Sequence, residues 1–325
     1  MFHSIPRPAR PTSPKLRLAT LGALLLSLLL VLTACGASSD DGGSSASGTT
    51  GADAGGWPVT VTGDNGELTL DEQPEAIVSM SASATEMLFA IGAGPQVEAV
   101  DNTSNYPDDA PVTDLSAFTP NAEAIAAYAP DLVVLSDDLN GIVDALGALE
   151  IPVLQLGAAQ TLEDSYEQLD TLGTATGHAD DTAKVVTEMQ DRIEAAVESV
   201  GDGGAGLRVY HELDPTFYSA ASSTFIGSVY ELFGLENIAD GAADASGGYP
   251  QLSAEYVVGQ APDLVVLADT VCCEQSAETF AERPAFDTLP AVQEGRILEM
   301  NDDIASRWGP RIADFAEAVA ASLQG

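Results

Sequence analysis

Basic side chains are scarce in this sequence. It contains 11 Lys and Arg against 50 Asp and Glu, which gives a formal net charge of −39 at neutral pH. Four of the basic residues precede residue 18, so the rest of the chain carries seven against the same fifty acids. Because nucleic-acid binding depends on Lys and Arg that neutralise phosphates, this composition excludes nucleic acid as a partner. Adaptation to salt or to an acidic proteome explains the acidity most simply, and the charge also favours a ligand that is neutral or locally neutralised.

Histidine is nearly absent as well, since only His178 and His211 lie beyond residue 3. A bare zinc or manganese site needs about three clustered His and carboxylate ligands, so the sequence predicts no directly bound metal ion. The motifs of P-loops, serine hydrolases and zinc proteases, GxxxxGK(S/T), GxSxG and HExxH, are also missing. We therefore expect a protein that is not an enzyme, and keep an enzyme with its active site in a cleft as the alternative.

The first 34 residues have the pattern of a secretory signal peptide. Four basic residues precede a run from Leu18 to Leu32 that is apolar except for Thr20 and Ser27. The run ends in Leu-Thr-Ala-Cys-Gly (32–36), which resembles a bacterial lipobox, so we expect cleavage before Cys35 and lipidation of its thiol. An uncleaved membrane anchor is the alternative, because the run is close to the roughly 17 residues of a short spanning helix. The mature protein should be extracytoplasmic and held at the cell membrane by its acyl chains.

A tether follows the lipidated cysteine, over residues 35–56. Its residues 36–56 include no aromatic and no branched aliphatic side chain. Such a segment cannot bury enough apolar area to offset the entropy of ordering, so it should stay disordered, with a reach of roughly 25 Å. The globular part then runs from Trp57 to Gly325, which is long enough for two lobes.

Short branched-aliphatic runs alternate with helical segments from Glu75 onward, which is typical of an α/β sheet. Strands are expected at 76–80, 97–100, 131–136, 152–156, 207–213, 263–268 and 296–300. A repeat supports two lobes of similar build, because NAEAIAAYAPDLVVLSD (121–137) returns as SAEYVVGQAPDLVVLAD (253–269) with ten identical residues in seventeen. Each copy contains a helix, an Ala-Pro-Asp turn and a buried parallel strand.

One long polar helical stretch, residues 179–200, separates the two series of strands, and GDGGAG (201–206) ends it. At 1.5 Å per residue this helix would span about 33 Å. The sequence thus predicts an α/β fold with an N-terminal lobe (57–178), a connecting helix (179–200) and a C-terminal lobe (201–325), each lobe with a mainly parallel sheet. Since ligands in open α/β sheets bind beyond the carboxyl ends of the strands, the expected site is a cleft between the lobes.

Seven segments together resemble the solute-binding proteins of cobalamin and ferric-siderophore ABC importers. They are PEAIVSMSASATEMLFAIGAG (74–94), SNYP (104–107), NAEAIAAYAPDLVV (121–134), LGTATGH (172–178), STFIGSVYELFG (223–234), YPQLSAEYV (249–257) and RWGPRIADF (307–315). The resemblance implies a carrier, expected to be monomeric, that hands its ligand to a permease and its ATPase. It also implies small lobe movements about the single helix. The segments at 83–92 and 104–107 resemble cobalamin binders, so a corrinoid is the expected ligand, with a ferric siderophore or haem as the alternative.

Two glutamates, Glu123 and Glu255, occupy equivalent positions in the repeat, each two residues after an expected helix N-cap, Asn121 or Ser253. The helix dipole stabilises a carboxylate in the first turn, which is a sufficient structural reason for them. The resemblance instead implies that each lobe presents one of these carboxylates to arginines of the permease, where such charges set orientation and association rate.

Aromatic residues in the loops that follow the strands are candidates for ligand contact, although each could instead belong to the core. Rigid rings cover the broad face of a macrocycle at low entropic cost. The candidates are Tyr106, Phe118, Tyr218, Phe225, Tyr249 and Trp308, together with Ser81 and Ser83 in the loop after the first strand. Arg307 could pair with an acidic group of the ligand or with an internal carboxylate, and the internal role is the one expected for Arg311.

Three further features are expected to be structural. Ser83 and Glu86 fit a capping box, in which each side chain accepts a hydrogen bond from the other's backbone. His211 ends an expected strand and fits an ordinary buried imidazole. Cys272 and Cys273 are adjacent in an exported protein, so they could form a vicinal disulfide or remain two buried thiols. Adjacent Cα atoms lie about 3.8 Å apart, below the usual disulfide range of about 4.4 to 6.8 Å, so such a ring would stiffen its loop.

The substitution Cys35→Ala tests the expected anchor. Without the thiol no diacylglycerol can be attached, so the protein should move from the membrane fraction to the soluble fraction, as measured by fractionation and immunoblotting. Continued retention at the membrane would contradict the lipoprotein assignment.

Overall fold

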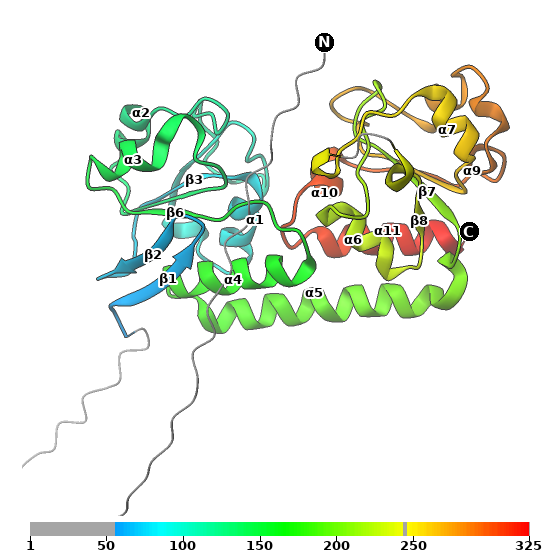
Figure 1. Cartoon of the computed structure of the whole chain (residues 1–325). Coiled ribbons are helices and arrows are strands. Elements are labelled where there is room, and N and C mark those ends of the chain that lie inside the picture. The colour runs from blue at the N-terminus through cyan, green and yellow to red at the C-terminus, as the bar shows by residue number, and fades with distance from the viewer. Residues whose placement is uncertain (1–55, 243–245, 325) are drawn as a thin grey trace, which may run out of the picture. The chain divides into compact units, whose positions relative to one another are not determined.

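The computed structural model describes residues 56–242 and 246–324. The expected signal peptide, Cys35 and the tether up to residue 55 lie outside these ranges. Two four-stranded parallel sheets form two lobes, which confirms the expected fold class (Figure 1). In the described part of the chain, no helix combines the length and the apolar composition needed to cross a bilayer.

The N-terminal lobe contains a parallel sheet with strand order β4-β3-β5-β6. Its strands are β3 (Ile77–Met80), β4 (Val97–Val100), β5 (Leu132–Leu135) and β6 (Val153–Gln155). Its helices are α1 (Ala82–Ala90), α2 (Ala122–Ala126), α3 (Ile142–Gly147) and α4 (Leu162–Thr176). All four residues of β3 and of β5 are buried, as expected for central strands covered on both faces.

A β-hairpin that the sequence did not predict precedes this sheet. It pairs β1 (Val59–Gly63) with β2 (Gly66–Leu70) in an antiparallel ladder closed by Asp64 and Asn65. Both turn residues hold the end of β6, because Asp64 N–H donates to Gln155 O at 2.8 Å and Asn65 Nδ2 donates to Val153 O at 2.9 Å. The hairpin thus covers a sheet edge that would otherwise present unpaired backbone groups.

The C-terminal lobe repeats this plan with strand order β8-β7-β9-β10. Its strands are β7 (Arg208–Glu212), β8 (Glu236–Asn237), β9 (Leu264–Leu267) and β10 (Ile297–Glu299). Its helices are α6 (Phe225–Leu232), α7 (Ala254–Gln260), α8 (Ala277–Ala281), α9 (Pro290–Gln293), α10 (Asp302–Ser306) and α11 (Ile312–Gln324). If the parallel strands of each lobe are numbered in the order of the chain, their order across the sheet is second, first, third, fourth in both lobes. The seven strands expected from the sequence are confirmed, whereas β8 has only two residues and no hydrophobic run to mark it.

The repeated Ala-Pro-Asp turn has the same function in both lobes. Asp131 Oδ2 accepts hydrogen bonds from the N–H groups of Glu75 and Ala76, both at 3.0 Å, just before β3. Asp263 Oδ2 accepts one from Arg208 N–H at 2.9 Å, at the start of β7. The repeat therefore encodes both a buried strand and the carboxylate that satisfies the first backbone donors of the neighbouring strand.

The helix α5 (Ala179–Val200) runs beneath both lobes and packs against α4 and α11 (Figure 1). Its buried side chains include Met189, Ile193 and Ala196. Gly173 of α4 permits close contact with the first turn of α5, because a Cβ atom at residue 173 would overlap Thr182 Oγ1. Packing along its length makes α5 a brace rather than a free linker.

Candidate functional site

Four of the six candidate aromatic residues are exposed on loops that follow parallel strands. Tyr106 (42% exposed) and Phe118 (71%) lie in the loop after β4, Tyr218 (41%) lies after β7, and Tyr249 (46%) lies after β8. Because these loops leave the carboxyl ends of their strands, both lobes present aromatic rings at the edge where α/β sheets bind ligands. Whether these rings contact a ligand remains a prediction.

The ring of Phe225 is not exposed on a loop, which is where a ligand-contacting ring was expected. It is the first residue of α6, it is 4% exposed, and it belongs to the hydrophobic core. The loop after β7 ends at Thr224, whose side chain caps α6 by accepting a hydrogen bond from Gly227 N–H at 3.1 Å. That cap fixes where the helix begins and turns Phe225 inward.

The two candidate serines are also buried, at 5% for Ser81 and 3% for Ser83. Ser81 is the N-cap of α1, and its side chain accepts a hydrogen bond from Ala84 N–H at 3.4 Å. Ser83 Oγ accepts one from Trp308 N–H at 3.3 Å. The expected capping box between Ser83 and Glu86 is therefore wrong, because α1 begins two residues earlier and places Glu86 within the helix.

Glu86 is the centre of a buried ion-pair network. It is 2% exposed, and its carboxylate accepts hydrogen bonds from Arg307 Nη1 at 3.0 Å and from Arg311 Nη2 at 2.5 Å and Nε at 3.0 Å. Gly309 leaves room for this carboxylate, since a Cβ atom there would lie 3.0 Å from Glu86 Oε2. Two guanidinium groups offset the cost of burying one charged carboxylate. The RWGPR segment thus folds around Glu86 rather than toward open solvent.

Arg307 forms internal contacts, which is the alternative that the sequence left open for it. Besides Glu86, its Nη2 donates to Thr103 O at 2.9 Å and to Asp303 Oδ1 at 2.6 Å. Asp303 Oδ2 in turn accepts a hydrogen bond from Asn105 Nδ2 at 2.9 Å. These bonds join the loop after β4 in the N-terminal lobe to α10 in the C-terminal lobe.

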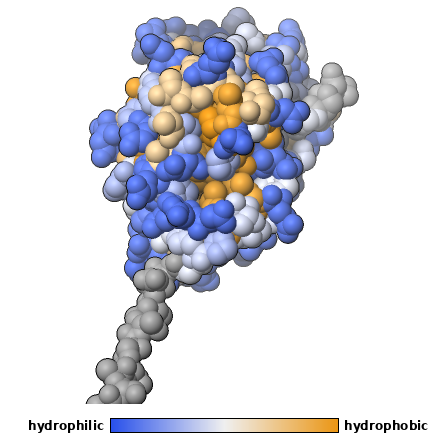
Figure 2. Space-filling view, turned by 90° about the vertical axis from the view of Figure 1, so that its left-hand side faces the viewer, coloured by the Kyte–Doolittle hydropathy of each residue, from blue (hydrophilic) through white to orange (hydrophobic). Residues whose placement is uncertain are grey.

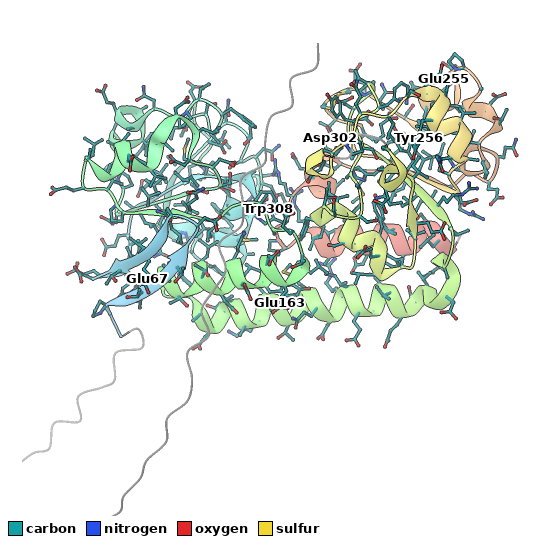
Figure 3. All side chains as sticks on the ribbon, in the orientation of Figure 1. Glu67, Glu163, Glu255, Tyr256, Asp302 and Trp308 are labelled. Carbon is teal, nitrogen blue, oxygen red and sulfur yellow. A yellow bond between two sulfur atoms is a disulfide. The ribbon has the colours of Figure 1, made fainter. Side chains whose placement is uncertain are left out.

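Trp308 lies between the two lobes (Figure 3). Its indole Nε1 donates to Gln168 Oε1 at 2.9 Å, and its carbonyl accepts a hydrogen bond from Ser165 Oγ at 2.5 Å. Both partners belong to α4, so the ring is partly buried against the N-terminal lobe. A ligand could reach only the remaining part of this side chain.

A cavity of about 400 Å³ lies beside this network. Tyr106 forms one wall, with Arg311 Cζ 4.0 Å from the centre of its ring, a cation–π distance. The lining residues are Glu86, Phe89, Ala90, Tyr106, Pro107, Arg192, Pro310, Arg311 and Asp314. The cavity therefore combines residues of α1, the loop after β4, α5 and the segment that leads into α11.

A second buried acidic cluster lies at the carboxyl ends of β7 and β9. Arg283 binds Glu212 through two hydrogen bonds of 2.6 and 2.5 Å, and Tyr210 OH donates to Glu212 Oε2 at 3.0 Å. Burial and the neighbouring charge of Glu212 raise the pKa of Asp269 to about 7. No sequence pattern singles out Asp269 or Glu212, although the scarcity of arginine could have pointed to Arg283.

His211 is fully buried, and its Nδ1 lies 2.6 Å from Tyr230 OH. Burial lowers the pKa of His211 to about 3, so the ring is neutral at physiological pH. This environment fits the expected structural imidazole. Within the described ranges, no group of three or more His, Cys, Asp and Glu side chains is placed to hold a metal ion.

Every Lys and Arg side chain that the structure describes forms an ion pair with an Asp or Glu. The seven are Lys184, Arg192, Arg208, Arg283, Arg296, Arg307 and Arg311. The three arginines that are most deeply buried, Arg283, Arg307 and Arg311, are each held by a buried glutamate. Figure 2 shows a largely hydrophilic surface around an apolar band at the outer end of the N-terminal lobe, as the excess of acidic residues would suggest.

Glu123 and Glu255 lie in the first turns of α2 and α7, and both are exposed. Figure 1 shows α2 and α7 on the side of the lobes away from α5, and Figure 3 shows Glu255 at that side. Neither carboxylate forms an ion pair within the described part of the chain. Their location leaves both available to a partner, and their docking role remains a prediction.

Cys272 and Cys273 form a disulfide in the loop after β9. Val271, just before it, is 67% exposed. This segment follows the second copy of the repeat, whereas the first copy continues with Asp138-Leu139-Asn140 and has no cysteine. The disulfide is thus a feature of the C-terminal lobe alone.

The sequence model of the family described as periplasmic binding protein matches residues 77–304. Over 268 residues the chain is 32% identical to a cobalamin-binding protein of Halobacterium salinarum, covering 79% of this chain and 72% of the relative. It is 28% identical to an uncharacterized ABC transporter substrate-binding lipoprotein of Bacillus subtilis, covering 82% of this chain and 86% of the relative.

Solved structures show the same fold. The periplasmic vitamin B12-binding protein of Vibrio cholerae is 23% identical with a TM-score of 0.63, covering 77% of this chain and 97% of that one. The periplasmic haem-binding protein of Roseiflexus sp. RS-1 is 20% identical with a TM-score of 0.67, covering 77% and 97%. At these identities the likeness concerns the arrangement of the chain and not the ligand.

The substitution Glu86→Gln tests the buried network. It leaves Arg311 without a carboxylate partner and Arg307 with Asp303 alone, so the free energy of unfolding should fall by about 3 kcal/mol. The matched control is Glu317→Gln, which removes an exposed carboxylate from Arg192 and should cost less than about 1 kcal/mol. Denaturant unfolding measures both, and equal small losses would show that Glu86 does not hold this region together.

Proposed function

The chain belongs to the periplasmic binding protein family, and on that premise we propose that it is the lipid-anchored, extracytoplasmic substrate-binding protein of an ABC importer for a corrinoid. It captures the ligand between its lobes and delivers it to a permease. The observation that carries this proposal is the set of four exposed aromatic rings on strand-end loops of both lobes, in a molecule whose described cations are all paired. A corrin ring offers broad apolar faces to such rings.

A corrinoid is favoured over a ferric siderophore for two reasons. Relatives named for cobalamin or vitamin B12 cover most of this chain at 28 to 32% identity. A highly anionic ferric catecholate would also need cations, and each described Lys and Arg is bonded to a carboxylate. Haem and neutral hydroxamate chelates remain the alternatives, since a haem-binding protein shares the fold.

A carrier function agrees with the state of the ionisable side chains better than catalysis does. His211 is buried and neutral, Glu86 is held by two arginines, and Glu212 is held by Arg283. A general acid or base must reach a reacting atom on the substrate, and none of these groups is exposed to do so. Release of an unchanged ligand is the expected outcome of each transport cycle.

The brace along α5 favours small lobe movements during capture. Helices α4 and α11 pack against α5, and the hydrogen bonds of Arg307 and Asn105 join the two lobes above it. A wide hinge motion would break these bonds, whereas rearrangement of the loops after β7 and β8 would not. Ligand entry should therefore depend mainly on the loops that carry Tyr218 and Tyr249.

Docking to the permease is assigned to Glu123 and Glu255. They are exposed, unpaired in the described chain and similarly placed on the two lobes. Two separated carboxylates on one side of the molecule can orient it over a transporter that has two similar subunits. The partner would supply the cations, because each Lys and Arg in residues 56–242 and 246–324 is paired with a carboxylate.

A titration of the full chain, purified in detergent, tests the ligand assignment. Trp308 lies between the lobes, so its fluorescence should be quenched by cyanocobalamin with submicromolar affinity, and more weakly by haemin or ferric siderophores. Tyr218→Ala should weaken binding about tenfold, or about 1.4 kcal/mol. Tyr128→Ala is the control, because Tyr128 has similar exposure (38%) but follows α2 rather than a strand. Submicromolar binding of a siderophore without binding of cobalamin would overturn the preference for a corrinoid over a siderophore. Recovery of a chemically altered ligand would overturn the carrier role.

Charge reversal tests the docking side. The double variant Glu123→Lys/Glu255→Lys should abolish ligand uptake by cells while the affinity of the purified protein for cyanocobalamin stays within about twofold. The control Glu188→Lys/Glu198→Lys makes the same change in charge on exposed positions of α5, and should leave uptake intact. A large loss of affinity in the first variant would show that these glutamates serve the ligand instead.

A further inference from the structure

The loop between β9 and α8, residues 269–275, carries an unusual combination of side chains. Cys272 and Cys273 close a ring through their disulfide, and Val271 beside them is 67% exposed. In the described chain only Phe118 is a more exposed large apolar residue, at 71%. Cys272 is exposed and Cys273 is partly exposed, so these two residues and Val271 form a small apolar surface at the tip of the loop.

Hydrogen bonds fix this loop against α10. The carboxylate of Asp302 accepts one from Val271 N–H at 2.9 Å and one from Cys272 N–H at 2.7 Å. Thr270 Oγ1 donates to Met300 O at 2.7 Å, and Cys273 N–H donates to Asp269 O at 3.3 Å. The backbone on both sides of the ring is therefore held in one arrangement, with the side chain of Val271 left free.

The loop lies beside the contact between the lobes. Asp302 is adjacent in sequence to Asp303, which accepts the hydrogen bond from Asn105 of the N-terminal lobe. Figure 3 shows Asp302 at the edge of the C-terminal lobe that faces the N-terminal lobe. A ligand held between strand-end loops would meet Val271 and the disulfide on this side.

The chemistry of the ring suits the flat apolar face of a macrocycle. Sulfur is polarisable and makes favourable contacts with π systems. Closing the ring also removes conformational freedom from two residues before a ligand arrives, and such preorganisation raises affinity without any new contact. A serine pair would offer neither property.

We propose, resting on the function proposed above, that Val271 and the Cys272–Cys273 ring form a specificity-determining wall for the apolar face of the ligand, and that reduction of the ring weakens ligand binding. A dithiol reductant would give two electrons and two protons to the S–S bond. The sulfur–sulfur bond breaks, two thiols form on the protein, and the reductant becomes a disulfide. The freed loop then no longer presents Val271 in a fixed position.

The experiment compares cyanocobalamin binding by the full chain in detergent in three forms: oxidised, reduced with dithiothreitol, and the double variant Cys272→Ser/Cys273→Ser. Affinity should fall about tenfold on reduction and by the same factor in the variant. The variant should not respond to dithiothreitol, which excludes an effect of the reductant on the ligand. Thiol counting should find two additional thiols after reduction, and unfolding temperatures without ligand should agree within a few degrees.

Val271→Ser provides a second test that leaves the disulfide in place, and Leu232→Ser, an exposed residue at the end of α6, is its matched control. Val271→Ser should lower the affinity severalfold, and the control should not change it. Equal affinities of the oxidised protein, the reduced protein and the Cys272→Ser/Cys273→Ser variant would overturn the inference. Free thiols at residues 272 and 273 in the purified protein would overturn it as well. Failure of the oxidised wild type to bind any chelate would refute the proposed function itself.

Discussion

The buried carboxylate of Glu86 and the two guanidinium groups around it hold the two halves of the molecule in register. Glu86 belongs to α1 of the N-terminal lobe, whereas Arg307 and Arg311 flank the turn between α10 and α11. A buried charge without its partner is far more costly than an exposed one, so neither side can move away alone. The cavity lined by Tyr106 lies beside this contact, and Trp308 is the residue next to Arg307.

Scarcity of basic residues gives each remaining one a defined role. The sequence has fifty acids, and every arginine that the structure describes lies beside a carboxylate, so the buried ones are fixed structural points. The same scarcity shapes recognition. The function proposed above accordingly uses apolar contacts for the ligand and assigns the positive charge of the docking contact to the permease.

The main sheets could be predicted from the sequence because each strand is a short run of branched aliphatic residues buried on both faces. The hairpin of β1 and β2 could not, since its alternating residues are half exposed and its stability comes from bonds to the distant strand β6. At the site, exposure of Tyr106 and Phe118 follows from their loops. Phe225 belongs to the core, the alternative that was left open for each ring, because Thr224 caps α6 and Phe225 begins that buried helix.

By itself the sequence determined the class of fold, the duplication of the lobes and the scarcity of cations. The fold class follows from the local periodicity of apolar residues, the duplication from the repeat, and the scarcity of cations from the composition. Only the tertiary structure decided which acid each arginine meets. Glu86 and Arg307 are 221 residues apart, and no local pattern selects one carboxylate among fifty. That choice depends on which surfaces are brought together when α4 and α11 pack against α5. This packing places α1 of the N-terminal lobe beside the segment between α10 and α11.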